Sequence, residues 1–548
     1  MISLRFHLLL ERCGAGRETK LGFSPLKAAL VDPGAKNRPH MKNAPPTLWT
    51  PDTLCVTGGL KRTSWTTMSS DSTLASTSWT PGKSKDCGRG SHWRDAAEVY
   101  ITQQAGETVQ RQEYILKLAR ALMMFGGPAN RFEAQLQATG NVIGIEVYAL
   151  YLPDTLFISF EDGISVMNGS LRMVRQSRTL NLVKLDAVYD LYCNVIEGRT
   201  VVTQASSVLD AFMLDKRREY CWWQRILIGG MCSATVCLVS FNGSLIDALV
   251  SFPLGAFLIA AQLLSEDNVL FSNIFEISMA TLFSLISAFL ASTGRFCYPA
   301  ITSSSIVLIL PGFAVLTGAL ELMSRNIASG AVRMVYAVVY ALFLGFGLAM
   351  GAEGYEILRG GRSVRGAIDF TCSLSHDPRG GWWQRTPGLF WAFLTVPMFA
   401  LFLSMRNLAP LRSRGMLLLI VVACVGSATT NFAKTVIINQ SNLTAAIGSF
   451  AVGLTANVIA RFSAGNAFVI MITGMLFQLP SGLGDGGLLN YASDTTGGSP
   501  TSLLAGFQTG LQLVGVGVGM GVGLGIALVL VHPWNSRGAE RDGGVFSL

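Results

Sequence analysis

Apolar runs of similar length dominate the chain after residue 225. Each has about the 20 residues that a helix needs to cross a bilayer, and most are separated by short polar stretches. The pattern predicts an α-helical polytopic membrane protein with about ten transmembrane helices in two sets of five. The runs cover residues 226–242, 244–264, 270–291, 297–322 and 331–351, and then 388–404, 416–432, 443–460, 465–480 and 502–531.

The chain before these runs has two parts. Residues 1–95 are rich in Ser, Thr, Pro and Gly, show no sustained period, and are predicted to be disordered. Residues 107–220 combine amphipathic helical stretches with an alternating segment at 147–162, which indicates two short strands in a small α/β domain. Basic residues at 216–218, followed by Trp222 and Trp223, mark a cytoplasmic membrane boundary, so the domain is expected in the cytosol.

The predicted domains follow from these boundaries. After the 107–220 domain come a first membrane repeat at 226–351, a connecting loop at 352–387, a second repeat at 388–531 and a tail at 532–548. Glycines at every fourth position of the last run predict close helix packing. Homo-oligomer formation is left open.

Composition excludes several classes of function. Only 14% of the residues are charged, against roughly 25% in soluble domains. The net charge of +8 does not indicate nucleic-acid binding, because no basic stretch is interleaved with aromatic residues. Ten cysteines without a CxxC pair favour neither a disulfide framework nor a zinc site. The five histidines all lie outside the apolar runs, which argues against histidine catalysis or metal binding inside the membrane. No metal or cofactor is expected.

The fourth apolar run carries the most unusual polar pattern, four consecutive hydroxyl residues followed by a Pro-Gly pair. Proline removes a backbone N–H and glycine lets a solute approach the backbone, so the helix is predicted to break in mid-membrane. Broken helices build many transporter sites, and a half-helix N-terminus suits a carboxylate. The simpler interpretation is a structural kink whose hydroxyls bond to the preceding turn. The substrate-binding residues predicted here are Thr302, Ser303, Ser304, Ser305, Pro311 and Gly312.

Two matches between the halves suggest an internal duplication. The sequence CWWQR at 221–225 is nearly repeated as GWWQR at 381–385, and the fourth run of the second half ends in a second proline-containing stretch, FQLPSGLGDGG at 477–487. Because five spans is an odd number, two similar halves must be inverted relative to each other, with a solute site between the two breaks. Pro480 and Ser481 are therefore added to the predicted substrate-binding residues.

Other polar groups within the spans are costly in hydrocarbon and must face protein or water. Asn431, Asn457 and Gln478 are predicted to bind substrate, and Glu276 is the candidate for a proton-linked carboxylate, with a helix-end carboxylate near the headgroups as its alternative. Three charged residues lie near predicted span ends, where reaching the membrane interface is the easier explanation. These are Asp247, Glu321 and Lys434.

Three long blocks of the chain resemble one known family. They are ALMMFGGPANRFEAQLQATGNVIGIEV, ILPGFAVLTGALELMSRNIASGAVRMVYAVVYALFLGFG and NFAKTVIINQSNLTAAIGSFAVGLTANVIARF. They resemble the threonine/serine exporter family, in particular its fungal pheromone-regulated membrane protein 10-like branch, over roughly residues 105–532. The resemblance implies ten spans, a cytosolic N-terminal domain, and proton-driven export of small hydrophilic amino acids. Many bacterial members have Pro-Gly at the second break, where this chain has Leu479-Pro480-Ser481-Gly482.

Several hypotheses remain open at this point. Some bacterial members with the two halves on separate chains resemble a succinate exporter, so a dicarboxylate is the alternative solute. A membrane-tethered hydrolase would need a base in the 107–220 domain, which has no histidine, and no GxSxG motif occurs. A membrane scaffold in mating is a third hypothesis. A transporter that is not an enzyme is the leading one, in the plasma membrane or in an endomembrane such as the vacuole.

Overall fold

The computed structural model describes residues 90–161, 170–215, 220–266, 269–359, 376, 381–409, 414–437, 440–463, 466–484 and 502–531. The chain from Gly106 onward belongs to one compact unit. Most of the predicted disordered segment 1–95 lies outside the described residues, but helix α3 already begins at Gly90. The tail at 532–548 and most of the 352–387 connection also lie outside them.

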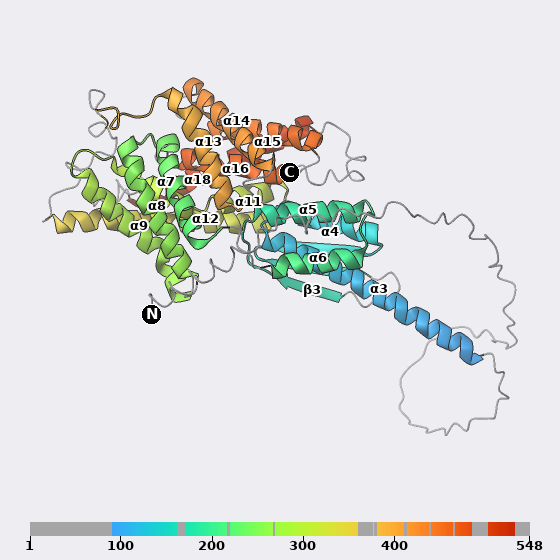
Figure 1. Ribbon diagram of the computed structural model, residues 1–548. Helices are drawn as coiled ribbons and strands as arrows, with labels where there is room; N and C mark the ends of the chain where they lie inside the picture. Colours follow the sequence, from blue (N-terminus) through green and yellow to red (C-terminus); the bar gives the residue numbers. More distant parts are fainter. Residues whose placement is uncertain are drawn as a thin grey trace, which may run out of the picture. The chain divides into compact units, whose positions relative to one another are not determined.

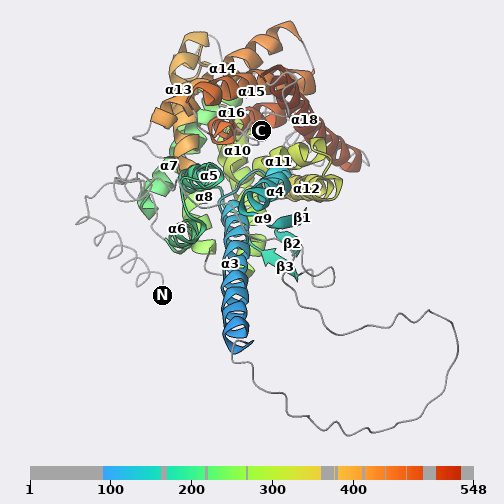
Figure 2. The same ribbon diagram turned by 90° about the vertical axis from the view of Figure 1, so that its right-hand side faces the viewer.

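A segment of helices and one antiparallel sheet precedes the membrane helices, and we refer to it as the α/β domain. Its antiparallel sheet has the order β1-β2-β3, and alternate residues of β2, Leu156, Ile158 and Phe160, are buried. Figure 2 shows the sheet beside α3 and α4. The sequence predicted β1 and β2 but not the short β3. The domain consists of α3 (Gly90–Met124), η1 (Ala129–Arg131), α4 (Phe132–Ile143), β1 (Glu146–Leu152), β2 (Thr155–Glu161), β3 (Ser170–Arg175), α5 (Leu182–Ile196) and α6 (Val202–Leu214).

The remaining helices coincide with the ten apolar runs to within four residues, except that α12 continues to Leu358 beyond its run at 331–351, and they form a bundle in two halves (Figure 1). The first half contains α7 (Trp222–Ser240), α8 (Leu245–Ser265), α9 (Val269–Ala291), α10 (Tyr298–Ile306) with η2 (Val307–Ile309) and α11 (Gly312–Met323), and α12 (Ile327–Leu358). The second half contains α13 (Leu389–Arg406), α14 (Arg414–Val436), α15 (Ser441–Ser463), α16 (Ala467–Gly484) and α18 (Ser502–Val531).

Seven helices of the described chain are long and apolar enough to cross a membrane, and the bent pair α10–α11 makes an eighth candidate. The apolar parts of α13 and α16 that the structure describes are shorter. The chain is therefore a predominantly helical polytopic membrane protein.

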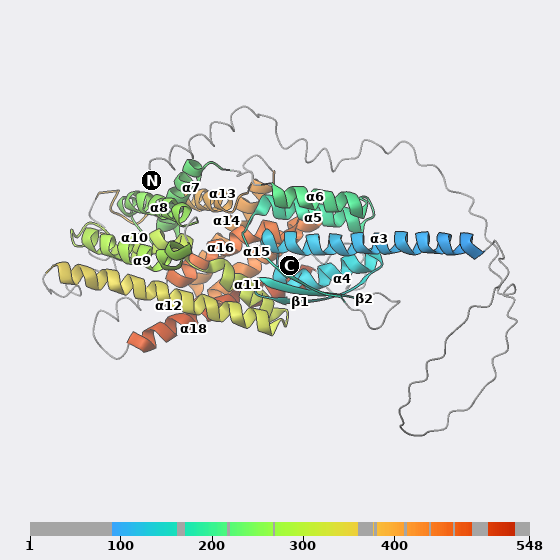
Figure 3. The same cartoon turned by 90° about the horizontal axis from the view of Figure 1, so that it is seen from below.

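The two halves use the same helix pairings. In each half the first helix packs on the second, the third on the fifth, and the fourth on the second, third and fifth. The halves meet where α7 packs on α13 and where α18 packs on α11 and α12. Figure 3, seen from below, shows α18 next to α12, where the two helices are in contact.

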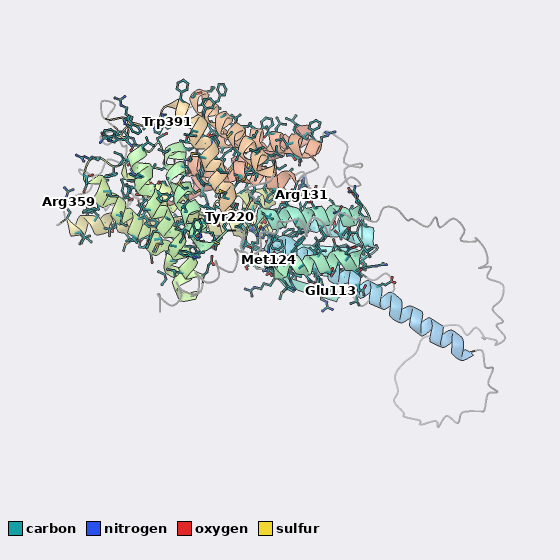
Figure 4. All side chains as sticks on the ribbon, in the orientation of Figure 1. Glu113, Met124, Arg131, Tyr220, Arg359 and Trp391 are labelled. Atoms are coloured by element: carbon teal, nitrogen blue, oxygen red, sulfur yellow. The ribbon has the colours of Figure 1, made fainter. Side chains whose placement is uncertain are left out.

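Helices α7 and α13 lie antiparallel. The Tyr220 hydroxyl, just before α7, donates a 2.8 Å hydrogen bond to the carbonyl of Ala409, just after α13. At the other end of α7, the N–H of Ile246 in α8 donates to the carbonyl of Trp383 before α13. We call the end with Tyr220 the domain end and the end with Ile246 the far end. Figure 4 labels Tyr220 at the domain end and Trp391, in the first turn of α13, at the far end.

The predicted break of the fourth run is confirmed in the first half, where α10 and α11 are bent by 62° at Leu310–Pro311. The predicted matching break in the second half is wrong for the described residues, because the backbone of α16 stays helical through Pro480 to Gly484. The repeated WWQR sequence also differs in structure. Trp222 starts α7, with Gln224 closing a cap on Cys221, whereas Trp382 lies in a turn before α13.

Candidate functional site

The break in the fourth span is built by its own sequence. Pro311 cannot continue the hydrogen bonding of the preceding turn, and α11 restarts at Gly312 with Pro311 as its N-cap. An added Cβ on Gly312 would lie 2.9 Å from Leu479 of α16, so the glycine permits close contact between the fourth helices of the two halves. The break therefore lies where the halves meet.

A cavity of about 220 Å³, which we call the break cavity, lies beside this interruption. Most of its lining is apolar, and Arg406 at the end of α13 is the charged member among the described residues that line it. The Arg406 guanidinium donates 3.4 Å hydrogen bonds to the Leu308 carbonyl at the break and to Gln262 Oε1 of α8. The lining comprises Leu180, Cys232, Val307, Leu308, Leu310, Gly312, Phe313, Phe399, Leu403, Arg406, Asn407, Leu476 and Leu479.

The geometry of the break cavity suits an anionic group. Arg406 supplies a fixed positive charge, and the N-terminus of the 12-residue helix α11 supplies N–H groups and the positive end of a helix dipole. Leu180 belongs to the α/β domain, and Arg406 and Asn407 lie at the domain end of α13. The cavity therefore extends from the middle of the bundle toward the domain end.

A second cavity of about 180 Å³, which we call the far cavity, lies toward the other end. Its lining is mainly polar and includes the far ends of α7 and α14. The buried Gln478 side chain lies where Gly426 and Gly448 leave room, because an added Cβ on either glycine would come within 3 Å of the Gln478 amide. The lining comprises Val239, Ser240, Asn242, Ser427, Thr430, Asn431, Lys434, Phe477 and Gln478.

An aromatic pair separates the two cavities. Phe399 of α13 lines the break cavity and Phe477 of α16 lines the far cavity, and their ring centroids lie 4.9 Å apart. Both rings belong to a buried apolar cluster with Cys232, Val236 and Ala423. The bundle therefore has the break cavity on one side of a layer of apolar side chains and the far cavity on the other.

The predicted substrate-binding residues fall into two groups. Gly312 lines the break cavity, and Asn431 and Gln478 line the far cavity. The hydroxyl residues 302–305 are buried but line neither cavity. The Ser305 hydroxyl donates to the Ile301 carbonyl, and that of Ser304 donates to Ser251 Oγ of α8 at 2.7 Å. For these two residues, the contacts are those of helix packing.

The other predicted residues lie away from the cavities. Asn457 is buried in α15 and donates to the Gly453 carbonyl at 2.8 Å. Glu276 is half-buried between α9 and α12, where its carboxylate accepts a hydrogen bond from Tyr340. Pro311 forms the N-cap of α11, whereas the side chains of Pro480 and Ser481 are outside the described part of the chain.

The interface explanation for Asp247 and Glu321 is wrong, because both carboxylates are almost fully buried. Glu321 of α11 pairs with Arg333 of α12, with 3.0 Å between Oε1 and Nε, and accepts a 2.6 Å hydrogen bond from Ser329. The Arg333 guanidinium also donates to the hydroxyl of Tyr151 on β1. Each carboxylate has polar partners that compensate for its burial.

The α/β domain is thus joined to the broken span. Arg178 stacks on the Tyr151 ring, with 4.9 Å from the guanidinium carbon to the ring centroid, and also on Phe132. Burial, with a smaller contribution from Arg333, lowers the pKa of Arg178 to about 10. Burial raises the pKa of Tyr151. The ionic contacts of α11 therefore continue into the domain.

Sequence reasoning missed Arg406 and the Phe399–Phe477 pair. Arg406 lies at the end of its apolar run near two further arginines, which gave it the pattern of a membrane-surface anchor. Phe399 is one of many aromatic residues in the spans, and only the packing of α13 on α16 distinguishes it.

Comparison with known proteins identifies relatives of the chain. Residues 113–354 match the family model ThrE, described as "Putative threonine/serine exporter". "Pheromone-regulated membrane protein 10" of Candida glabrata is 33% identical over 426 residues, covering 77% of this chain and 50% of that protein. The proteins of the same name from Saccharomyces cerevisiae and Pichia sorbitophila are 32% and 33% identical over 420 residues, covering 76% of this chain and 50% and 39% of theirs.

The chain thus spans about half the length of the curated relatives it matches. No solved structure matches it. The matched segment contains most of the α/β domain and nearly all of the first membrane half, including the break at Pro311. Over this segment the chain is similar to the threonine/serine exporter family, as the sequence resemblance predicted.

Proposed function

We propose that the protein is a secondary transporter that exports small hydrophilic amino acids, such as threonine and serine, from the cytosol by alternating access. The observation that carries this proposal is the pair of cavities on opposite sides of the Phe399–Phe477 layer, one of them at a broken helix. A volume of about 220 Å³ is smaller than the roughly 300–1,000 Å³ of drug-sized sites, as a small solute requires.

In this proposal the halves form an inverted repeat of ten spans. The antiparallel α7 and α13 and the shared helix pairings support it. The domain end then faces the cytosol. A disulfide at Cys297, at the far end, supports this orientation, because disulfides persist in oxidising compartments.

The break cavity would bind the solute first. Arg406 would accept the solute carboxylate as its counter-ion, assisted by the N-terminal N–H groups of α11. The Leu308 carbonyl, which now accepts from Arg406, would then be available to the solute ammonium. Arg406 and the Leu308 carbonyl are 3.4 Å apart, so they could bind the carboxylate and the ammonium group of one amino acid.

Release would follow a change in the apolar layer. Separation of Phe399 and Phe477 would join the break cavity to the far cavity. Hydroxyl and amide groups of the far cavity could then form hydrogen bonds with the solute in place of those it made in the break cavity. A proton gradient is the energy source we propose, with Glu276 remaining the sequence-based candidate for a coupling carboxylate. The plasma membrane is the proposed location, and an endomembrane such as the vacuole is the alternative.

The test is transport by the full chain in proteoliposomes, with labelled threonine, serine and succinate offered separately. We expect threonine and serine transport, and a loss of about 10- to 100-fold in solute affinity for Arg406→Gln, since a hydrogen bond to a charged group contributes about 1.5–3 kcal/mol. Arg199→Gln, in the exposed Arg199–Glu197 pair, is the matched control. Transport of succinate alone would favour the dicarboxylate alternative, and wild-type transport by Arg406→Gln would exclude the proposed binding role.

A further inference from the structure

The linker between β3 and α5, residues 176–181, lies at the domain end of the break cavity. Leu180 of this linker lines the cavity, although it belongs to the α/β domain. Two residues later, the N–H of Leu182 donates a 3.2 Å hydrogen bond to the carbonyl of Asn407, which follows α13 and also lines the cavity. The linker therefore lies against the same end of α13 that carries Arg406.

Hydrogen bonds hold the linker to the domain. The N–H and the hydroxyl of Thr179 both donate to the carbonyl of Met124, the last residue of α3, at 3.1 and 3.0 Å. The N–H of Asn181 donates to the carbonyl of Phe125 at 3.3 Å. The bond from Leu182 to Asn407 is, by contrast, a single backbone contact with α13 within the described part of the chain. A linker that moves is therefore expected to move with α3 and to separate from α13.

The turn after α3 holds Leu180 in its position. Gly126 of this turn has a φ of +82°, and an added Cβ there would lie 3.2 Å from Cδ1 of Leu180 and 3.3 Å from its Cα. The turn thus packs against Leu180 on one side, and the break cavity lies on the other. Leu180 therefore has little room to withdraw from the cavity while the domain stays in place.

The same linker is connected to the broken span. Arg178 stacks on the Tyr151 ring, and the Tyr151 hydroxyl accepts a hydrogen bond from Arg333, the partner of Glu321 on α11. The short helix η1 also packs directly on α11. A displacement of α11 at the break would therefore be transmitted to the domain, and through the domain to Leu180.

We propose that the linker 176–181 is the domain-end gate of the break cavity and that Leu180 is the side chain that closes it, an inference that rests on the proposed transport function. With the bond from Leu182 to Asn407 formed, Leu180 closes the cavity toward the domain end. When α11 tilts, the α/β domain moves with it, this bond breaks, and Leu180 leaves the cavity. One backbone hydrogen bond contributes little net stability, so a minor open state is accessible.

Two native cysteines of α7 report on the gate. Cys232 lines the break cavity, whereas Cys237, on the same helix, donates to the Ala300 carbonyl and lines neither of the two cavities. Both side chains are fully buried. The detergent-purified full chain is treated with a small maleimide at one pH, and labelling at each cysteine is followed by peptide mass spectrometry. The ratio of the Cys232 rate to the Cys237 rate corrects for general loosening of the bundle.

We expect Leu180→Ala to raise this ratio at least about tenfold, because a minor open state of the parent is populated to about 10% or less. Leu180→Met keeps a side chain of similar bulk and should label as the parent does. Ser177→Ala, at an exposed position of the same linker, is the matched control. An unchanged ratio in Leu180→Ala, or an equal rise at both cysteines, would overturn the proposal.

The part of the domain in opening has its own variant. Tyr151→Phe keeps the ring under Arg178 but removes the hydroxyl that accepts from Arg333. We expect a rise in the ratio that is smaller than that of Leu180→Ala, and no rise would exclude the coupling of the gate to α12. The labelling needs no solute, so a raised ratio without threonine transport would leave the gate standing and contradict only the proposed function.

Discussion

Arg333 on α12 places its Nε 3.0 Å from Oε1 of Glu321 on α11, and this ion pair holds α11, the part of the broken span after Pro311, against α12. Glu321 is 1% exposed, so a change to either partner leaves a buried charge without compensation. We expect Glu321→Gln and Arg333→Met each to destabilise the detergent-purified protein by about 3–5 kcal/mol. Thermal unfolding followed by tryptophan fluorescence is the measurement.

The control for this prediction is the exposed pair Arg199–Glu197 in the α/β domain, where Arg199→Gln should shift the melting temperature little. The double variant Glu321→Gln/Arg333→Met should recover part of the loss, because no charge then stays buried. Equal melting temperatures for the Glu321→Gln variant and the parent would show that the pair does not stabilise the fold.

The aromatic layer predicts a leak. Phe477→Ala removes one of the two rings whose centroids are 4.9 Å apart and leaves a space between the cavities. We expect proteoliposomes loaded with labelled threonine to lose it passively, and the protein to be less stable by about 3–5 kcal/mol. Phe477→Leu should be intermediate, and Phe393→Ala, at an 81% exposed position on α13, should behave as the parent. A tight Phe477→Ala vesicle would argue against this layer as the barrier.

The slot that holds Gln478 predicts a steric effect. A Cβ on Gly448 would lie 2.1 Å from Thr430 Oγ1 and 2.8 Å from Gln478 Oε1, so Gly448→Ala must displace one of them. Overpacking of this kind costs about 1–3 kcal/mol, and transport should fall with it because the far cavity is reshaped. Gly388→Ala is the matched control with open space. Unchanged stability and transport in Gly448→Ala would mean that the slot can expand freely.

The two glycine faces of α18 predict unequal effects of the same substitution. A Cβ on Gly523 would lie 2.2 Å from the Ala446 carbonyl of α15, which is backbone and cannot move away cheaply. A Cβ on Gly525 would meet the terminal carbon of Met323, which can rotate aside. We expect Gly523→Ala to lower the melting temperature clearly more than Gly525→Ala. The reverse order would contradict the packing of α15 on α18.

Local patterns in the sequence predicted the helices well. Apolar run length is a property of consecutive residues, so all ten runs became helices, and the chemistry of Pro311 was enough to predict the bend before it. The same reasoning failed at Pro480, where α16 continues as a helix. A proline breaks a helix only when the surroundings do not satisfy the freed backbone groups, and those surroundings are tertiary.

The candidate site was less predictable because it depends on which faces meet. The four consecutive hydroxyl residues at 302–305 predicted a substrate site. Ser304 instead donates to Ser251 of α8 and Ser305 to the preceding turn of its own helix, and neither lines a cavity. Arg406 was not among the predicted site residues, because a basic residue at the end of an apolar run is typical of an anchor at the membrane surface. It becomes a candidate ligand only because α13 brings it to the Leu308 carbonyl, 98 residues earlier in the chain.

The glycines of α18 also limit how the bundle can move. Gly519 and Gly523 set this helix against the backbone of α15, while Gly517 and Gly521 set it against side chains of α11 and α12. On the α15 side the nearest atoms are backbone carbonyls of Asn442 and Ala446, which cannot rotate aside as a side chain can. We therefore expect a tilt of α11, the half-helix after the break, to displace α18 and with it α15, the third helix of the second half. The two halves would then move together.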